Sequence, residues 1–130
     1  MQTSRYYETK SWPDENKPKF INIMLKVKTN LSPNKILNIC NTIELELGRK
    51  RSAKNAPRTC DIDIIDYDQE IINLYSKNLI IPHPAMVKRN FVLFPLFELD
   101  KNWKHPKSRI KIAELINSLS LKDLRSIKQI

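Results

Sequence analysis

The chain has 130 residues, 41% hydrophobic and 28% charged, which is enough for one folded domain with a single core. Its net charge of +9 favours polyanionic partners such as nucleotides, nucleic acids or anionic membranes. The one glycine, Gly48, excludes glycine-rich phosphate loops of the Walker and Rossmann kinds, which need several glycines at fixed spacing.

The two cysteines and the apolar segments bear on the cellular compartment. Cys40 and Cys60 match no metal or redox spacing, and we interpret both as small core residues in a reducing compartment. No signal peptide is visible, and the most apolar window, residues 90–99, is too short to cross a bilayer. We therefore expect a cytoplasmic protein that has no membrane partner.

The first two predicted elements are strands. Residues 3–12 carry aromatic weight from Tyr6 and Tyr7, and residues 20–29 end in an alternating apolar and basic pattern. A polar, proline-bounded loop, residues 13–19, separates them. The two segments are predicted to pair as an antiparallel hairpin.

A helix is predicted next, with signals at both of its ends. Ser32 is a natural N-cap, Pro33 suits the first helical position, and Gly48 is expected to form the C-cap. One apolar face has helical spacing and consists of Ile36, Cys40, Ile43 and Leu47. The basic residues 49–58 that follow have no apolar periodicity and are predicted to form a loop.

The second half of the chain contains shorter predicted elements. Residues 57–68 are predicted to form a strand, residues 69–84 further short extended pieces, and residues 84–89 one helical turn. Residues 90–99 are expected in the core. The apolar residues within 109–119 have the spacing of a second helix, and residues 122–130 show no clear pattern. No domain boundary is visible. The pattern predicts one α+β domain over residues 1–130, with helices on one side of an antiparallel sheet.

The strand at residues 57–68 carries the most specific chemical signal. Asp61 and Asp63 are two apart and project from one face, at most about 7 Å from each other. Mg²⁺ is typically held by one or two carboxylates, with waters and substrate phosphates as further ligands. The alternative is an exposed strand face on which both aspartates are solvated. The preceding segment adds cations that suit a magnesium–polyphosphate complex, or else form a solvated loop: Arg49, Lys50, Arg51, Lys54 and Arg58.

A second group of candidates lies in residues 80–99. Prolines on both sides restrict the backbone at His83, which could donate to a phosphate or could bond to a backbone group within its loop. Lys88 and Arg89 add positive charge. Phe91 could stack on a flat ligand or could pack in the core, and its pattern alone favours the core.

The ordered pieces "YYET", "FIN", "IELELGRKR", "APRTCDIDIIDYD", "IPHP" and "RNFVLFPLFEL" resemble the 6-hydroxymethyl-7,8-dihydropterin pyrophosphokinases of folate synthesis. The resemblance runs from about residue 4 to residue 105. It implies that the chain moves pyrophosphate from ATP to the pterin hydroxymethyl oxygen and releases AMP. No covalent nucleophile or acid–base pair is needed, because phosphoryl chemistry depends mainly on positioning and charge neutralisation.

The resemblance also implies a role for each matching residue. Asp61 and Asp63 match the aspartates that bind two Mg²⁺ ions bridging ATP, and Glu44 matches an acidic position near the site. The residues expected to hold ATP are Arg49, Arg51, Arg58, His83 and Arg89, of which Arg49 and Arg58 are also expected to be catalytic. The residues expected to form the pterin pocket are Thr9, Phe20, Asn22 and Phe91, with the ring stacked between the two phenylalanines.

The sequence departs from the family pattern in several places. The family's usual first strand, with a G-S-N-L motif, and the helix that follows it are not found, so the resemblance implies a ferredoxin-like sheet that is N-terminally incomplete. "APR" replaces the usual G-P-R, and Trp12 is an additional candidate for pterin-pocket surface.

The partners expected are ATP and a pterin, with a monomeric protein and no nucleic acid. Two alternatives stay open from the sequence alone: an inactive fragment of the kinase, and a basic RNA-binding module that stacks bases on exposed aromatics.

Overall fold

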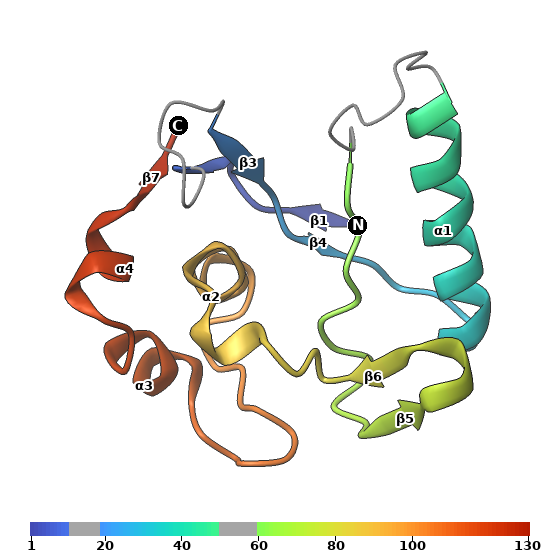
Figure 1. The fold of residues 1–130 in the computed structure, drawn as a ribbon. Helices are drawn as coiled ribbons and strands as arrows, with labels where there is room; N and C mark the ends of the chain where they lie inside the picture. Colours follow the sequence, from blue (N-terminus) through green and yellow to red (C-terminus); the bar gives the residue numbers. More distant parts are fainter. Residues whose placement is uncertain (11–18, 50–59) are drawn as a thin grey trace. The chain divides into compact units, whose positions relative to one another are not determined.

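The computed structural model describes residues 1–10, 19–49 and 60–130, without the side chain of Arg49. These residues form two compact units, which we describe separately (Figure 1). The first unit comprises Met1–Lys28 and Pro84–Ile130, and the second comprises Thr29–His83. The predicted α+β class is confirmed, because helices and antiparallel strand pairs are both present.

Two short antiparallel sheets are formed in the first unit. One pairs β1 (Gln2–Thr3) with β4 (Leu25–Lys26), and the other has the strand order β3-β2-β7, with β3 (Phe20–Asn22), β2 (Tyr7–Thr9) and β7 (Ile127–Gln129). The predicted hairpin is confirmed, since β1 and β2 pair with β4 and β3. Each predicted strand is nevertheless divided into two short ones.

The interruption of the hairpin lies at Ser4. The hydroxyl of this buried residue accepts a 2.8 Å hydrogen bond from the backbone N–H of Met24 and donates to the carbonyl of Arg5. The Ser4 N–H in turn donates to the Met24 carbonyl at 2.8 Å. A side-chain oxygen thus stands where a continuous ladder would use a backbone carbonyl, and pairing resumes at Tyr7 opposite Asn22 with the register shifted by one residue.

Helices supply most of the core of the first unit. A single turn, η2 (Met86–Lys88), precedes α2 (Asn90–Leu99), and α3 (Ile112–Asn117) and α4 (Leu121–Arg125) follow. The predicted turn at 84–89, core at 90–99 and helix within 109–119 are all confirmed. The buried side chains include Tyr7, Met86, Val92, Leu93, Leu96, Trp103, Ile112, Leu115 and Leu119.

The second unit begins with α1 (Pro33–Arg49), whose predicted start is confirmed. The Ser32 hydroxyl accepts a 3.3 Å hydrogen bond from the N–H of Lys35, as an N-cap does. The predicted C-cap at Gly48 is wrong, because α1 continues to Arg49 and Gly48 has no positive φ. The rest of the predicted loop at 49–58 lies outside the described residues.

The apolar face of α1 is less buried than its periodicity predicts. Ile36, Cys40 and Leu47 are half-buried, and Ile43 is exposed. Cys60, the first described residue after Arg49, is also half-buried, so the prediction that both cysteines are core residues is wrong. Periodicity identifies which face of a helix is apolar, but burial requires a second layer over that face. Partial burial, with the negative charge of Glu44 as a smaller cause, raises the pKa of the Cys40 thiol.

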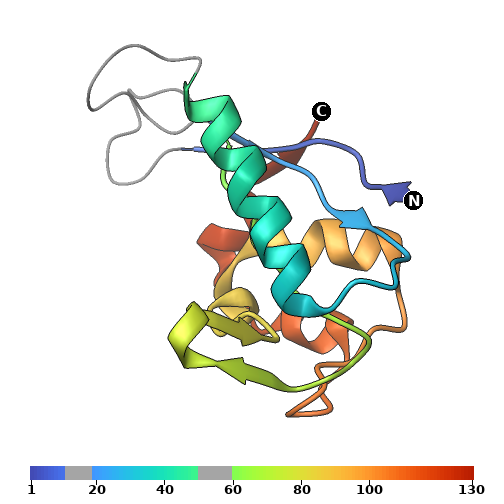
Figure 2. The ribbon, with the colours of Figure 1, turned by 90° about the vertical axis from the view of Figure 1, so that its right-hand side faces the viewer.

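The short extended pieces predicted after residue 68 are confirmed as the hairpin of β5 (Ile72–Leu74) and β6 (Leu79–Ile81), joined by η1 (Tyr75–Lys77). The hairpin lies at the N-terminal end of α1 in both views (Figure 1, Figure 2). Nearby, the Tyr67 hydroxyl donates a 2.8 Å hydrogen bond to the carbonyl of Leu31, just before that helix.

The predicted strand around the paired aspartates is not formed. Residues 60–66 have no strand assignment, and the part of 57–68 before residue 60 is not described. The alternation is still present, because Asp61 and Asp63 are exposed whereas Ile62 and Ile64 are partly covered. A strand needs a ladder partner as well as alternation, and here the N–H of His83 donates to the Ile65 carbonyl at 3.1 Å.

Candidate functional site

The second unit brings together two residues that are 20 positions apart in the sequence. His83 Nε2 lies 3.9 Å from Asp63 Oδ1, which is within ion-pair range but too long for a hydrogen bond. The side chain of Asp63 is 48% exposed and that of His83 is 21% exposed. The hydrogen bond from His83 N–H to Ile65 holds the backbone of the histidine beside the aspartate segment. A ligand from solvent can therefore reach the carboxylate while the imidazole stays in place.

The paired carboxylates have the donor chemistry that magnesium prefers. Asp61 and Asp63 are both exposed and offer hard oxygen ligands at i and i+2. Among the described residues, no group of three or more His, Cys, Asp or Glu side chains could form an all-protein metal cage. Two accessible carboxylates fit an ion that arrives with phosphate ligands better than a structural metal.

The first unit positions three of the predicted pterin residues on neighbouring strands. Thr9 on β2 is the register partner of Phe20 on β3, and Asn22 is the partner of Tyr7. Residues of β3 that are two apart project from the same face, so Phe20 and Asn22 share a face. Phe20 is 58% exposed and Thr9 is buried, so the aromatic ring is accessible for stacking beside a covered threonine on the neighbouring strand.

The remaining predicted residues of the first unit lie where α2 begins. Arg89 precedes the helix in an extended conformation, and its carbonyl accepts from the N–H groups of Val92 and Leu93, both at 3.0 Å. Its guanidinium carbon lies 5.5 Å from the centroid of the Phe91 ring, a cation–π distance. Phe91 is half-buried, so its side chain is neither fully within the core nor fully exposed.

The other predicted residues lie on α1 or outside the described residues. Arg51, Arg58 and Trp12 lie outside the described residues, as does the side chain of Arg49, whose backbone ends α1. Glu44 lies on α1 and is half-buried.

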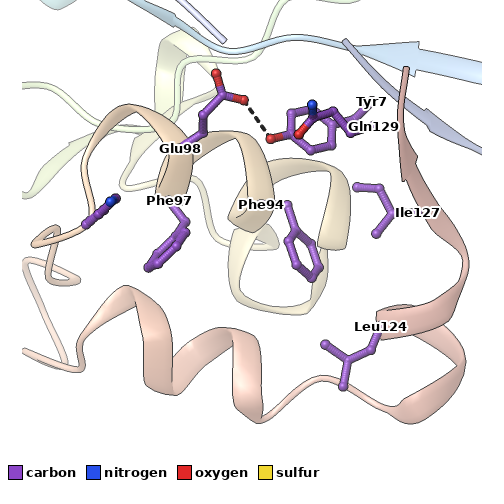
Figure 3. Close-up of a pocket in the computed structure, with 8 residues that line it drawn as sticks. Tyr7, Phe94, Phe97, Glu98, Leu124, Ile127 and Gln129 are labelled. Atoms are coloured by element: carbon purple, nitrogen blue, oxygen red, sulfur yellow. Dashed lines mark hydrogen bonds between the residues drawn. The ribbon is translucent and has the colours of Figure 1, made fainter. Parts of the chain in front are cut away.

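A pocket in the first unit was not predicted from the sequence (Figure 3). Its volume is about 460 Å³, and it lies between α2, β2 and the C-terminal α4 and β7. None of the described predicted site residues lines it. The lining residues are Tyr7, Phe94, Phe97, Glu98, Lys101, Leu124, Ile127 and Gln129. Its walls come from segments that are far apart in the chain, so local periodicity carries no signal for it.

Comparison with known proteins identifies the family. Residues 1–101 match the family model of 7,8-dihydro-6-hydroxymethylpterin-pyrophosphokinase. The chain belongs to this family. The match includes every site residue predicted from the sequence and passes through both units. The family resemblance, and the enzyme class predicted with it, are thus confirmed.

Several similar proteins match most of the chain. The 2-amino-4-hydroxy-6-hydroxymethyldihydropteridine pyrophosphokinase of Aquifex aeolicus is 41% identical over 92% of this chain and 73% of its own length. The enzyme of that name from Haemophilus influenzae is 39% identical, with the same two shares. A folic acid synthesis protein of Pneumocystis carinii is 37% identical over 98% of this chain, which spans only 17% of that relative.

In residues 1–10, 19–49 and 60–130, no helix has the length and apolar composition needed to cross a bilayer.

Proposed function

We propose that the chain transfers the β,γ-pyrophosphoryl group of ATP to the hydroxymethyl oxygen of 6-hydroxymethyl-7,8-dihydropterin, with release of AMP, in folate synthesis. The observation that carries this proposal is the continuous family match over residues 1–101, which includes both clusters of candidate residues. The relatives named as pyrophosphokinases support the same reaction.

The proposed ATP site uses the carboxylates and cations. Asp61 and Asp63 would hold two Mg²⁺ ions, and their exposure leaves room for phosphate oxygens and waters as the other ligands. When bound, the ions would neutralise phosphate charge and make the attacking hydroxyl more acidic. His83, beside Asp63, can donate from its imidazole to a phosphate oxygen. The cations proposed to bind the phosphates are Arg49, Arg51, Arg58 and Arg89, with Arg49 and Arg58 also acting in catalysis.

The proposed pterin site uses the strand and helix residues of the first unit. Phe20 and Phe91 would stack on the two faces of the flat ring, because aromatic side chains pack well against planar heterocycles. The Asn22 amide offers both a donor and an acceptor, as the pterin's hydrogen-bonding edge requires. Thr9, paired with Phe20 across the ladder, would define the edge of the pocket with its backbone.

The larger organisation is also a proposal. A single domain over residues 1–130 is supported by one family model that runs through both units. A ferredoxin-like sheet is supported by the antiparallel order β3-β2-β7. The monomeric state, the absence of a nucleic-acid partner and the cytoplasmic location stay predictions from the sequence.

The product distinguishes this reaction from ordinary kinase chemistry. Mass spectrometry of the pterin after incubation with ATP, Mg²⁺ and the chain should show the gain of a diphosphate group. Gain of a single phosphate, or an unmodified pterin, would contradict the proposal.

A further inference from the structure

The side chain of Asn90 forms a buried polar connection inside the first unit. Asn90 is 7% exposed, and its Nδ2 donates to the carbonyl of Asp123 at 2.7 Å and to Oγ of Ser126 at 3.2 Å. One acceptor lies within α4 and the other directly follows its last residue, 33 and 36 residues further along the chain. A buried amide without such partners would be costly, so these two bonds fix the side chain firmly.

The position of Asn90 in the sequence relates these hydrogen bonds to the proposed substrate sites. It lies between Arg89, proposed to bind ATP, and Phe91, proposed to stack on the pterin. It is also the first residue of α2, so its anchor sets the direction of the helical turn that carries the phenylalanine. The Arg89–Phe91 cation–π contact is formed across this anchored residue.

The packing around the connection is incomplete, which raises the importance of the two hydrogen bonds. Figure 3 shows Phe94 and Phe97 of α2 on one side of the pocket and Leu124 and Ile127 on the other. Apolar side chains separated by a cavity lose much of their dispersion attraction. The Asn90 bonds therefore carry a larger share of the attachment between α2 and the C-terminal segment.

The same C-terminal segment is tied to the strand that carries Thr9. Residues 121–130 contain α4 and β7, and β7 pairs with β2 in a register that sets Ile127 opposite Thr9. The segment thus holds the pterin strand through a ladder and the start of α2 through Asn90. It lies beyond residue 101, where the family match ends.

We propose that Asn90 is a positioning residue for the pyrophosphoryl transfer, which holds Arg89 and Phe91 in place for their substrates by anchoring them to residues 121–130. The inference rests on the proposed function and deepens it. Asn90 itself does not touch the substrates. Its effect passes through the orientation of the two neighbouring side chains.

The test compares steady-state kinetics of Asn90→Ala with those of a matched control. Asn90→Ala should raise KM for the pterin about tenfold, because the aromatic ring is no longer held for stacking. Ser120→Ala removes the hydroxyl that accepts from Asp123 N–H at the start of α4, so it weakens the N-cap of this helix without removing either acceptor of Asn90. KM for the pterin in this control should stay within twofold of the wild-type value.

The outcomes separate positioning from general destabilisation. An unchanged pterin KM in Asn90→Ala, or an equal rise in Ser120→Ala, would overturn the proposal. If Asn90→Ala does not fold, Ser126→Ala removes one of the two acceptors and should give a smaller rise in the same constant. Failure of the wild-type chain to make any pterin diphosphate would refute the proposed function instead, and with it this inference.

Discussion

The phenol of Tyr7 donates a 2.6 Å hydrogen bond to Oε1 of Glu98, which joins β2 to the end of α2. The two oxygens of the same carboxylate also accept from the backbone N–H of Arg5, at 3.1 and 3.0 Å. One acidic side chain thus holds the start of the strand that carries Thr9.

This arrangement predicts a loss of stability at alkaline pH. Burial, and then the hydrogen bond to the Glu98 carboxylate and its charge, raise the pKa of Tyr7 from 10.0 to about 12. The folded state favours the neutral phenol of Tyr7. The contribution of this phenol to the unfolding free energy is therefore complete below pH 10 and is lost as the pH rises toward 12. The unfolding free energy should therefore fall more between pH 10 and 12 in the wild-type chain than in Tyr7→Phe. Equal pH slopes in urea denaturation would contradict this expectation.

The hydrogen bond from Met24 N–H to the buried Ser4 hydroxyl predicts that replacing Ser4 lowers stability more than replacing an exposed serine does. Ser4→Ala removes the acceptor of the Met24 N–H and should lower the unfolding free energy by about 1–3 kcal/mol. Ser118→Ala is the matched control, because its exposed hydroxyl donates within α3's last turn, and should change stability by no more than about 0.5 kcal/mol. Chemical denaturation measures both, and equal effects would argue against this role of the Ser4 hydroxyl.

The conformation of Gly48 predicts a stabilising substitution. Gly48 is helical, and a Cβ added to it would meet nothing within 4 Å. Gly48→Ala should therefore raise the unfolding free energy by about 0.5–1 kcal/mol. A destabilisation would instead indicate the left-handed C-cap that the sequence suggested, since alanine is strained there. Thermal unfolding followed by circular dichroism distinguishes the two signs.

The exposure of Phe20 predicts that its substitution affects binding rather than folding. Phe20→Ala should raise the pterin Kd by about 10- to 100-fold, because a stacking face is lost. Ile21→Ala on the same strand is the control, since Ile21 is similarly exposed, at 57%, and projects from the opposite face. Pterin fluorescence titrations in the presence of a non-hydrolysable ATP analogue give both constants. Similar losses in the two variants would argue against a role for Phe20 in stacking.

The exposed carboxylate of Asp63 predicts a large loss of activity with little change in stability. Asp63→Asn keeps the side-chain shape but removes the charge that would hold magnesium, so kcat should fall by at least about 100-fold. Asp68→Asn is the charge-matched control, because Asp68 is exposed and its φ of 53° suits asparagine. Activity near the wild-type level in Asp63→Asn would remove this residue from the metal site.

The sequence predicts local features of this fold well. Ser32, Pro33 and the apolar spacing place the start of α1, since capping and periodicity are properties of neighbouring residues. The strand predicted at residues 60–66 is not formed, because an alternating pattern does not by itself supply a hydrogen-bonding partner strand. The predicted C-cap at Gly48 is wrong for a related reason, since glycine permits a left-handed cap without requiring one.

In the candidate site too, local sequence identifies some residues, whereas long-range contacts leave no local signal. Asp61, Asp63 and His83 are recognisable from residue type and spacing, and the structure adds the 3.9 Å approach of His83 to Asp63. By contrast, the Asn90 contacts with Asp123 and Ser126 cross more than 30 positions, and "SIKQI" lacks the alternation typical of a half-buried strand. Contacts of this kind are set by tertiary packing and leave little local trace.

A pyrophosphoryl transfer that needs both substrates can be tested by measuring AMP release by the 130-residue chain with ATP and Mg²⁺. We expect AMP only when 6-hydroxymethyl-7,8-dihydropterin is present, in equal amount to the pterin diphosphate formed. Release of ADP, or AMP at the same rate without the pterin, would contradict it.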